Sequence, residues 1–289
     1  LGHAHGLLWA FDSLYAVVGE TKPYPPGLYR VRDTNGDDVL DQVECLRELG
    51  GSGEHGPHAV VLGPDRQSLW IVAGNFTKVP ELASSRVPAT WAEDELLPHL
   101  DDPNGHDPHI KAPGGWVCRT DKDGKEFELF AVGLRNCYDL AFGPEGELFT
   151  YDSDMEWDVG APWYRPTRVL HLVSGADYGW RNGSAKWNAD WPDTLPSVVD
   201  LGLGSPTGVL YGNELAFPER YRRALFCADW AYGKVHCVTL TPRGSSFGGT
   251  SEVFVSGKPF PVTDLVAGDD GALYVTTGGR QTQSGLYRI

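Results

Sequence analysis

The sequence is short of positive charge, methionine and long apolar segments. Its 289 residues carry 24 lysines and arginines against 39 aspartates and glutamates, a formal net charge of −15. This balance argues against nucleic acid and anionic membrane surfaces as partners, because both carry phosphate groups that would repel the chain. No run of about 18 apolar residues occurs, which excludes a membrane-spanning helix and membrane insertion. The chain opens at Leu1 with no signal segment, so we expect a mature or truncated N-terminus.

Cysteine is scarce, and no pair of cysteines is spaced as CxxC or CxxCH. This absence excludes a zinc ribbon and an attached c-type haem within the chain. Among the five cysteines, Cys227 and Cys237 flank the turn of an expected hairpin. If Ala231 to Gly233 form that turn, the two side chains face each other and could be bridged. Two reduced, buried thiols are the alternative.

Glycine, proline and aromatic residues are plentiful, which favours short strands joined by turns. One pattern recurs: a short apolar strand, a turn with Pro, Asp or Gly, and a second apolar strand. The copies begin near residues 5, 58, 138, 207 and 262. Repetition of one supersecondary unit predicts an all-β fold, a β-propeller with five recognisable blades in a single domain spanning 1–289. A β-sandwich with many hairpins is the alternative, although a sandwich gives no reason for a repeated turn motif.

Residues 33–44, DTNGDDVLDQVE, have the spacing of a calcium-binding loop. Oxygen ligands fall at loop positions 1, 3, 5, 9 and 12, which are occupied by Asp33, Asn35, Asp37, Asp41 and Glu44. Position 6, where an EF-hand has glycine, is Asp38, a residue type that tolerates positive φ better than most. The preceding residues are typical of a strand, so the loop would connect two strands. An acidic turn without metal is the alternative.

Polar residues precede the first strand of three units. They are His3 and His5, His55 and His58, and Arg135 and Asn136. The first strand of a propeller blade faces the central channel, so these side chains are expected at its mouth. A histidine beside a fixed cation can remove a proton while the arginine stabilises a developing oxyanion. Histidines without a catalytic role in glycine-rich turns are the alternative.

Acidic residues alternate over 152–158, as Asp152, Asp154, Glu156 and Asp158. Carboxylates this close together repel one another unless a cation or an arginine lies among them. Arg165 and Arg168 follow directly, so either these arginines neutralise the acids or a second cation binds here.

Three motifs in this order, HGPHAVVLGPD, GLRNCYDLAFGPEGELF and HLVSGADYGWR, resemble the soluble quinoprotein glucose and aldose-sugar dehydrogenases. Those enzymes are six-bladed propellers that use PQQ and calcium. The DTNGDD loop and the stretch DMEWDVGAPWYRPTRVLHL are more similar still to the propeller domain of membrane-bound dehydrogenases of planctomycetes and verrucomicrobia. That domain is often fused to a c-type haem domain. The resemblance covers nearly the whole chain and implies a six-bladed type, with the remaining blade expected before Leu1.

The resemblance implies oxidation of a sugar or alcohol hydroxyl in the periplasm or outside the cell. His55 takes the place of the catalytic base, and Arg135 and Asn136 that of the pair contacting cofactor and substrate. His58, three residues after His55, is expected at the cofactor. The electron acceptor would be a c-type haem on another domain or chain.

The chain departs from the family at two places. Pro261 to Asp264 stands where the family carries Arg-x-Arg-Asp, and Asp229 with Trp230 stands where it carries Lys or Arg. Two alternatives therefore stay open. One is a calcium-stabilised propeller that binds a carbohydrate or protein without catalysis, for which the tryptophan-rich loops provide stacking surfaces. The other is a metal-dependent, lactonase-like hydrolase.

Overall fold

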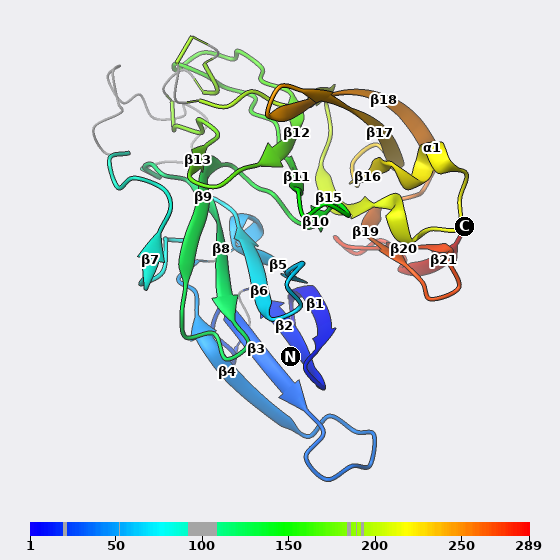
Figure 1. Ribbon diagram of the computed structural model, residues 1–289. Coiled ribbons are helices and arrows are strands. Elements are labelled where there is room, and N and C mark those ends of the chain that lie inside the picture. The colour runs from blue at the N-terminus through cyan, green and yellow to red at the C-terminus, as the bar shows by residue number, and fades with distance from the viewer. Residues whose placement is uncertain (20–21, 52, 92–108, 184–185, 189, 192–193) are drawn as a thin grey trace. The chain divides into compact units, whose positions relative to one another are not determined.

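A computed structural model describes residues 1–19, 22–51, 53–91, 109–183, 186–188, 190–191 and 194–289 (Figure 1). Strands dominate this part of the chain, and the α-helix within it is the short α1 (Glu219–Arg222). No helix among the described residues is long and apolar enough to cross a membrane. Inter-residue contacts divide the chain into two compact units, which we describe one by one. Unit 1 comprises 1–138, 157–163 and 173–195, and unit 2 comprises 139–156, 164–172 and 196–289.

Unit 1 contains two sheets. The first has the order β1-β2-β3-β4, all antiparallel, with β1 (Ala4–Ala10), β2 (Ser13–Val18), β3 (Gly27–Arg32) and β4 (Gln42–Glu48). The second joins β5 (Pro57–Leu62), β6 (Ser68–Ala73), β8 (Gly115–Asp121) and β9 (Glu128–Leu134), again antiparallel. The short strands β7 (Ser84–Ser85) and β13 (Ala176–Asp177) pair with β9 in parallel. A 3-10 turn, η1 (Gly53–His55), precedes β5.

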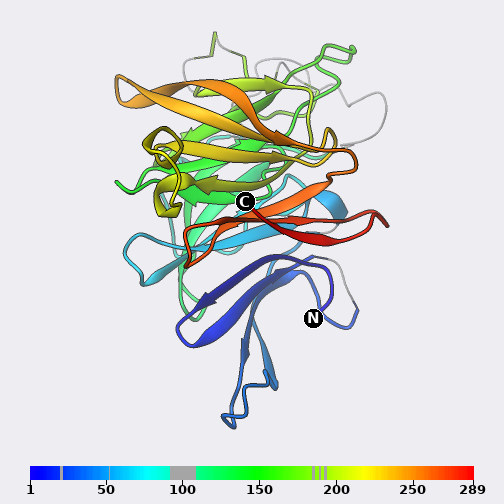
Figure 2. The same ribbon diagram turned by 90° about the vertical axis from the view of Figure 1, so that its right-hand side faces the viewer.

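Unit 2 contains three sheets. The first is β10 (Leu140–Phe142), β11 (Leu148–Asp152), β12 (Thr167–Leu172) and β14 (Val199–Gly202). The second is β15 (Pro206–Tyr211), β16 (Ala224–Asp229), β17 (Lys234–Arg243) and β18 (Ser246–Ser256), with the 3-10 turn η2 (Gly212–Glu214) after β15. The third is β19 (Val262–Ala267), β20 (Leu273–Thr277) and β21 (Gly285–Arg288). The long β17–β18 hairpin is clear in Figure 2.

These five sheets confirm the predicted all-β propeller with five recognisable blades. Their first strands start at residues 4, 57, 140, 206 and 262, within two residues of the predicted starts. The six-bladed type and the single domain over 1–289 stay predictions.

The sheets pack through apolar side chains on both of their faces. In unit 1, one core cluster joins the first two sheets through buried residues that include Tyr15, Val17, Ile71 and Trp116. In unit 2, the sheet of β15–β18 contributes Phe226 to one cluster and Leu225 to another, because neighbouring residues of a strand face opposite sides. Each fully buried side chain of this size contributes about 1.5–3 kcal/mol. Strands covered on both faces therefore show continuous apolar sequence rather than alternation.

The first strand of four blades has a bulge close to its start. The pairing register shifts between Ala4 and Gly6 in β1, between Pro57 and Val60 in β5, between Pro206 and Val209 in β15, and between Val262 and Asp264 in β19. A bulged residue has no ladder partner and its side chain is re-aimed. His5 and His58 both lie in these bulges, which takes their side chains out of the regular alternation.

The predicted facing of Cys227 and Cys237 is wrong. In the β16–β17 pair, Cys227 lies opposite His236 and Cys237 lies opposite Phe226. The turn is one residue longer than expected, since Asp229 pairs with Lys234. A one-residue change of register moves a side chain to the other face of the sheet. Cys227 and Cys237 are unbridged thiols, buried in separate core clusters.

Candidate functional site

His55 is held in unit 1 by a short hydrogen bond to Asn75. The imidazole is 2% exposed, lies at the end of η1, and stacks on the ring of Phe76 at 4.5 Å. Its Nδ1 is 2.6 Å from Oδ1 of Asn75. An amide oxygen only accepts, so Nδ1 carries the proton and the lone pair is on Nε2. This is the tautomer in which Nε2 can accept a proton.

Arg135 and Asn136 follow β9 and come close to His55 through the backbone of Gly74. Arg135 is 4% and Asn136 9% exposed. The Asn75 N–H donates to the Arg135 carbonyl at 2.8 Å. A Cβ on Gly74 would lie 2.6 Å from the His55 carbonyl oxygen and 2.7 Å from Oδ1 of Asn136. The backbone carbonyls of His55 and Arg135 and the side chain of Asn136 thus lie around Gly74 and Asn75 in one buried polar centre, and the absence of a side chain at residue 74 permits this approach.

His58 lies next to this centre and is also buried. Its Nε2 is 2.8 Å from Oδ1 of Asn136, and its Nδ1 is 3.0 Å from Nδ1 of His5. The Tyr138 ring stacks on the His58 ring at 3.8 Å, and the Tyr138 hydroxyl donates to the Glu54 carbonyl. Burial, followed by the nearby His5, lowers the pKa of His58 to about 3. His58 is therefore neutral at pH 7.

The depressed pKa of His58 predicts a loss of stability in acid. The imidazole titrates near 6.5 in the unfolded chain and near 3 in the folded one. Between these values the unfolded state binds a proton that the folded state excludes, so stability present above pH 6.5 is lost as the pH falls towards 3. The loss should amount to about 3–5 kcal/mol. Urea unfolding between pH 7 and 4 measures it.

The His58→Phe variant should show a shallower fall of unfolding free energy with pH than the parent. The His5 and Asn136 side chains face His58 and stay in place in this variant. His3→Phe, at an exposed residue, is the control and should keep the parent slope. Equal slopes for His58→Phe and the parent would contradict the prediction.

Two residues of this centre were not predicted from the sequence. Asn75 orients His55, and Tyr138 covers His58. The sequence signal for Asn75 is weak: Asn75 is a polar residue shortly after the buried strand β6. Nδ2 of Asn75 is buried and has no hydrogen-bond partner among the described residues.

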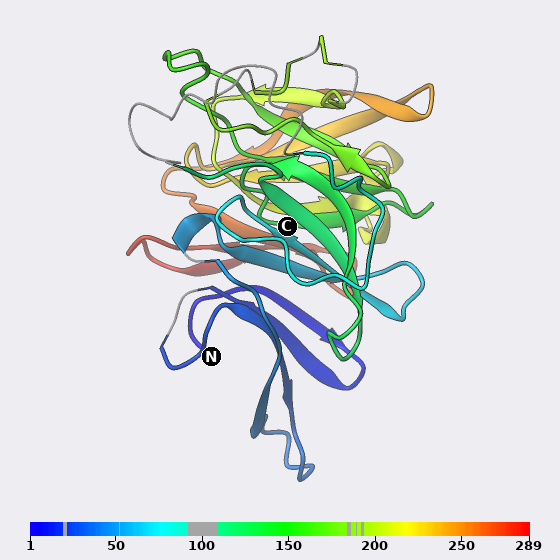
Figure 3. The ribbon, with the colours of Figure 1, turned by 90° about the vertical axis from the view of Figure 1, so that its left-hand side faces the viewer.

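The predicted calcium loop lies in unit 1 at the end of the β3–β4 hairpin, which extends beyond the rest of its sheet (Figure 3). Asp33 accepts backbone N–H groups of Asn35, Gly36 and Asp38, which lowers its pKa. Asp38 has a φ of 65°, the left-handed conformation expected at position 6.

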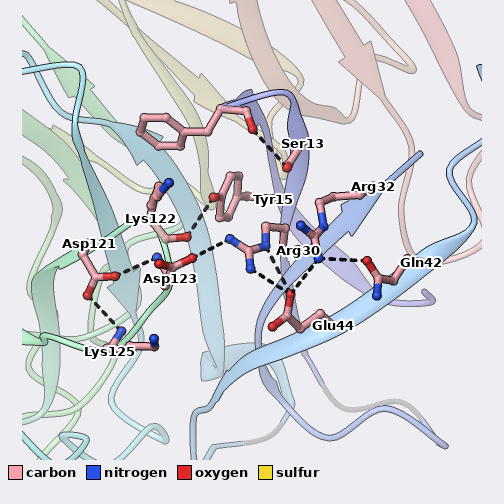
Figure 4. Close-up of polar contacts among 11 residues, drawn as sticks. Ser13, Tyr15, Arg30, Arg32, Gln42, Glu44, Asp121, Lys122, Asp123 and Lys125 are labelled. Atoms are coloured by element: carbon pink, nitrogen blue, oxygen red, sulfur yellow. Dashed lines mark hydrogen bonds and ion pairs between the residues drawn. The ribbon is translucent and has the colours of Figure 1, made fainter. Parts of the chain in front are cut away.

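All five predicted calcium ligands bind protein groups in this structure, and two of them, Asp41 and Glu44, bind side chains. Asp41 accepts from the Thr34 hydroxyl, and Glu44 pairs with Arg30 at 2.8 Å and with Arg32 at 3.6 Å (Figure 4). No group of three His, Cys, Asp or Glu side chains in the described ranges is arranged to hold a metal ion. Calcium binding by Asp33, Asn35, Asp37, Asp41 and Glu44 stays a prediction, and it requires Glu44 to leave its arginines.

The acidic run over 152–158 is held by protein groups. In unit 2, Asp152 is fully buried and pairs with Arg168 at 3.4 Å, and Asp154 accepts from the Tyr164 hydroxyl at 3.1 Å. In unit 1, Asp158 accepts the backbone N–H of Lys186 at 2.9 Å. These contacts favour neutralisation by protein groups over a second cation.

Unit 2 places acids where the quinoprotein pattern has basic residues. Asp229 is fully buried, accepts three backbone N–H groups on Oδ1, and has Lys234 at 3.6 Å from Oδ2. Asp264 lies at the start of β19, close enough to Asp139 to raise the pKa of that carboxyl beyond the effect of burial. Carboxyl groups at these positions do not fit the carboxylates of PQQ, because like charges repel.

Comparison with solved structures identifies the same fold in sugar dehydrogenases. An oxidoreductase from Thermus thermophilus, described as a glucose dehydrogenase, is 20% identical with a TM-score of 0.70, over 98% of this chain and 82% of that one. The PQQ-bound aldose sugar dehydrogenase of Streptomyces coelicolor is 14% identical with a TM-score of 0.65, over 96% and 75%. A calcium structure of a carbohydrate-active family AA12 protein from Trichoderma reesei is 11% identical, with a TM-score of 0.59, over 94% and 78%.

At these identities the likeness establishes the fold. No protein-family model matches the chain, and no curated protein sequence matches it.

Proposed function

We propose that the protein oxidises a hydroxyl group of a sugar or alcohol outside the cytoplasm, with a quinone as the two-electron acceptor. The observation that carries the proposal is the buried centre of unit 1, in which the His55 carbonyl and the Asn136 amide flank Gly74 and the Arg135 carbonyl accepts the Asn75 N–H. The centre combines a proton acceptor, a fixed cation and an amide, the groups that alcohol oxidation requires. The similar folds of sugar dehydrogenases support it.

Each residue of the centre has a distinct role in this proposal. Asn75 fixes a proton on Nδ1 of His55, and in the neutral ring Nε2 of His55 then receives the hydroxyl proton. The Arg135 guanidinium stabilises negative charge that develops on oxygen. His58 stays neutral and holds Asn136, whose amide orients the substrate or the acceptor. No step is derived through PQQ, because the acids of unit 2 do not fit it.

Cofactor titration followed by dye reduction tests the proposal. Purified protein is titrated with PQQ and calcium and then assayed with a panel of aldoses and alcohols. The proposal expects reduction of the dye by at least one substrate, and a shift of the quinone absorbance would identify PQQ as the quinone despite the acids of unit 2. If a folded protein gives neither signal, the remaining alternative is a non-catalytic carbohydrate-binding propeller. The acids Asp229 and Asp264 favour this alternative. A c-type haem on a separate domain or chain is the proposed physiological acceptor, and the periplasm or cell exterior the proposed location.

Calcium in the 33–44 loop belongs to the same proposal. If Asp33, Asn35, Asp37, Asp41 and Glu44 bind calcium, then millimolar calcium should raise the melting temperature of the protein, because a ligand that binds only the folded state stabilises it. The rise should be absent in Asp33→Ala, since Asp33 supplies position 1 of the loop. Asp269→Ala, at an exposed acid elsewhere, should respond to calcium as the parent does. Equal melting temperatures of the parent with calcium and with chelator would reject the site.

A further inference from the structure

His5 has a tautomer that its neighbours fix. Its Nδ1 is 3.3 Å from the Pro57 carbonyl oxygen and 3.0 Å from Nδ1 of His58. A carbonyl oxygen only accepts a hydrogen bond, so Nδ1 of His5 carries the proton and donates to both partners. In a neutral imidazole the other nitrogen then has the lone pair. Nε2 of His5 is therefore a hydrogen-bond acceptor.

The tautomer of His5 also determines the tautomer of His58 and the direction of the hydrogen bond between His58 and Asn136. Nδ1 of His58 accepts from His5, so the proton of the neutral His58 ring is on Nε2. This Nε2–H donates to Oδ1 of Asn136 at 2.8 Å, an assignment consistent with the amide orientation. One arrangement of protons thus satisfies the chain from Pro57 through His5 and His58 to Asn136. The Tyr138 ring, stacked at 3.8 Å, holds the His58 ring in place.

His5 differs from the other two imidazoles in its exposure. His55 and His58 are 2% and 0% exposed, whereas His5 lies in the bulge of β1 and is exposed. No hydrogen bond to Nε2 of His5 is formed within the described part of the chain. Burial of part of the ring, with His3 nearby, lowers the pKa of His5, so the ring is neutral at pH 7. A neutral acceptor at the surface is thus linked by hydrogen bonds to the buried centre.

We infer that Nε2 of His5 accepts a hydrogen bond from a hydroxyl group of the substrate, with His58 as the positioning residue that fixes this acceptor. The inference rests on the proposed function, and it identifies a substrate-recognition group in addition to His55. A hydroxyl donor fits because the neutral His5 ring offers a lone pair and carries no positive charge. A carboxylate or phosphate ligand would meet that lone pair with repulsion.

NMR of the ring nitrogens tests the tautomer without an activity assay. In ¹⁵N-labelled protein at pH 7, two-bond correlations should identify His5 as the Nδ1–H form and His58 as the Nε2–H form. In His58→Phe one of the two acceptors of the His5 Nδ1–H is lost while the Pro57 carbonyl remains, so the share of the Nδ1–H form of His5 should fall. A parent protein with His5 in the Nε2–H form would overturn the inference. So would His5 signals that are the same in His58→Phe and the parent.

Ligand binding provides the second test, with glucose and galactose as probes. Their addition should shift the Nε2 signal of His5 in the parent, and His5→Phe should raise the KM for the oxidised sugar about 3- to 10-fold with little change in kcat. His5→Gln, whose amide oxygen can accept, should recover part of the loss. Asp269→Ala, at an exposed residue of unit 2, is the control and should keep the parent KM.

The outcomes of the ligand test distinguish the two ideas. An unchanged KM in His5→Phe overturns the inference while the proposed function stands. If no sugar is oxidised, the proposed function fails, and the His5 shift on addition of sugar still decides whether His5 binds a hydroxyl. No shift at saturating sugar overturns it.

Discussion

Replacement of His55 by alanine should lower dye-reduction turnover by about 10²- to 10⁴-fold, the range that a positioned general base contributes. His55 is the imidazole whose proton Asn75 fixes on Nδ1, beside Arg135 and Asn136 in the buried centre. Without Nε2 of His55 the substrate hydroxyl loses the proton acceptor that this centre offers. The effect should fall on kcat, because the imidazole acts in the transition state. Steady-state kinetics with the best substrate of the panel measures it.

The Asn75→Ala variant separates the base from its orientation. It keeps the imidazole and removes the partner that fixes the tautomer, so a smaller loss of turnover than in His55→Ala is expected. Asp269→Ala, at an exposed residue of unit 2, serves as the unaffected control. Turnover of His55→Ala equal to that of the parent, in a variant with the parent melting temperature, would remove His55 from the role of base.

Replacement of Arg168 by methionine should destabilise the protein by about 3–5 kcal/mol. Arg168 of β12 lies opposite Asp152 of β11, with side chains 4% and 0% exposed and 3.4 Å between their charged atoms. Methionine fills the space of the arginine stem and removes the cation beside the buried Asp152 carboxylate. Loss of one partner of a buried ion pair costs far more than the pair itself contributes. Urea unfolding at pH 7 gives the difference.

An exposed ion pair of the same unit supplies the control. Arg223 and Glu219 are 2.8 Å apart, with side chains 78% and 72% exposed. Arg223→Met should change the unfolding free energy by less than about 0.5 kcal/mol, because solvent screens exposed pairs. The double variant Asp152→Leu with Arg168→Met should recover most of the loss. Equal effects of Arg168→Met and Arg223→Met would show that the buried pair is not needed for stability.

The positions of the blades could be predicted from the sequence because their determinants are local. An apolar strand, a turn with Pro, Asp or Gly, and a second apolar strand lie within about 20 residues of one another. The third strands of the first and last blades, β3 and β21, begin with the same four residues, GLYR. Burial on both faces of strands such as β6 and β16 selects the apolar residues that made the repeats visible.

The partners within the site could not be predicted, because they are distant in sequence. His5 and His58 are 53 residues apart, and His58 and Asn136 are 78 apart. The motifs placed these residues near the start of their blades, and the bulges then determine which side chains meet. Asn75 carried no signal beyond its position after a buried strand. The ion pair of Glu44 with Arg30 was missed because the loop spacing does not depend on it.

The error at Cys227 and Cys237 has a single physical cause. A turn one residue longer than assumed reverses the face of every later side chain in the strand. Turn length depends on backbone contacts of Asp229, whose Oδ1 accepts the N–H groups of Ala231 and Tyr232. A sequence pattern of apolar residues does not depend on such contacts. It therefore does not determine which face of the sheet a side chain occupies in the strand after a turn.

The bulges at the start of the first strands bear on how such a scaffold changes over evolution. A residue in a bulge has no partner in the ladder, so its replacement does not disturb the hydrogen bonds that hold the blade together. Unit 1 carries His5 and His58 in such positions, and unit 2 carries Thr207 and Thr263. Mutation at these points therefore leaves the backbone ladder of each sheet intact and removes only the side-chain hydrogen bonds, such as that of Thr207 to the Val262 carbonyl. In such a blade the backbone pairing can be conserved while the side chain in the bulge at the start of the first strand changes.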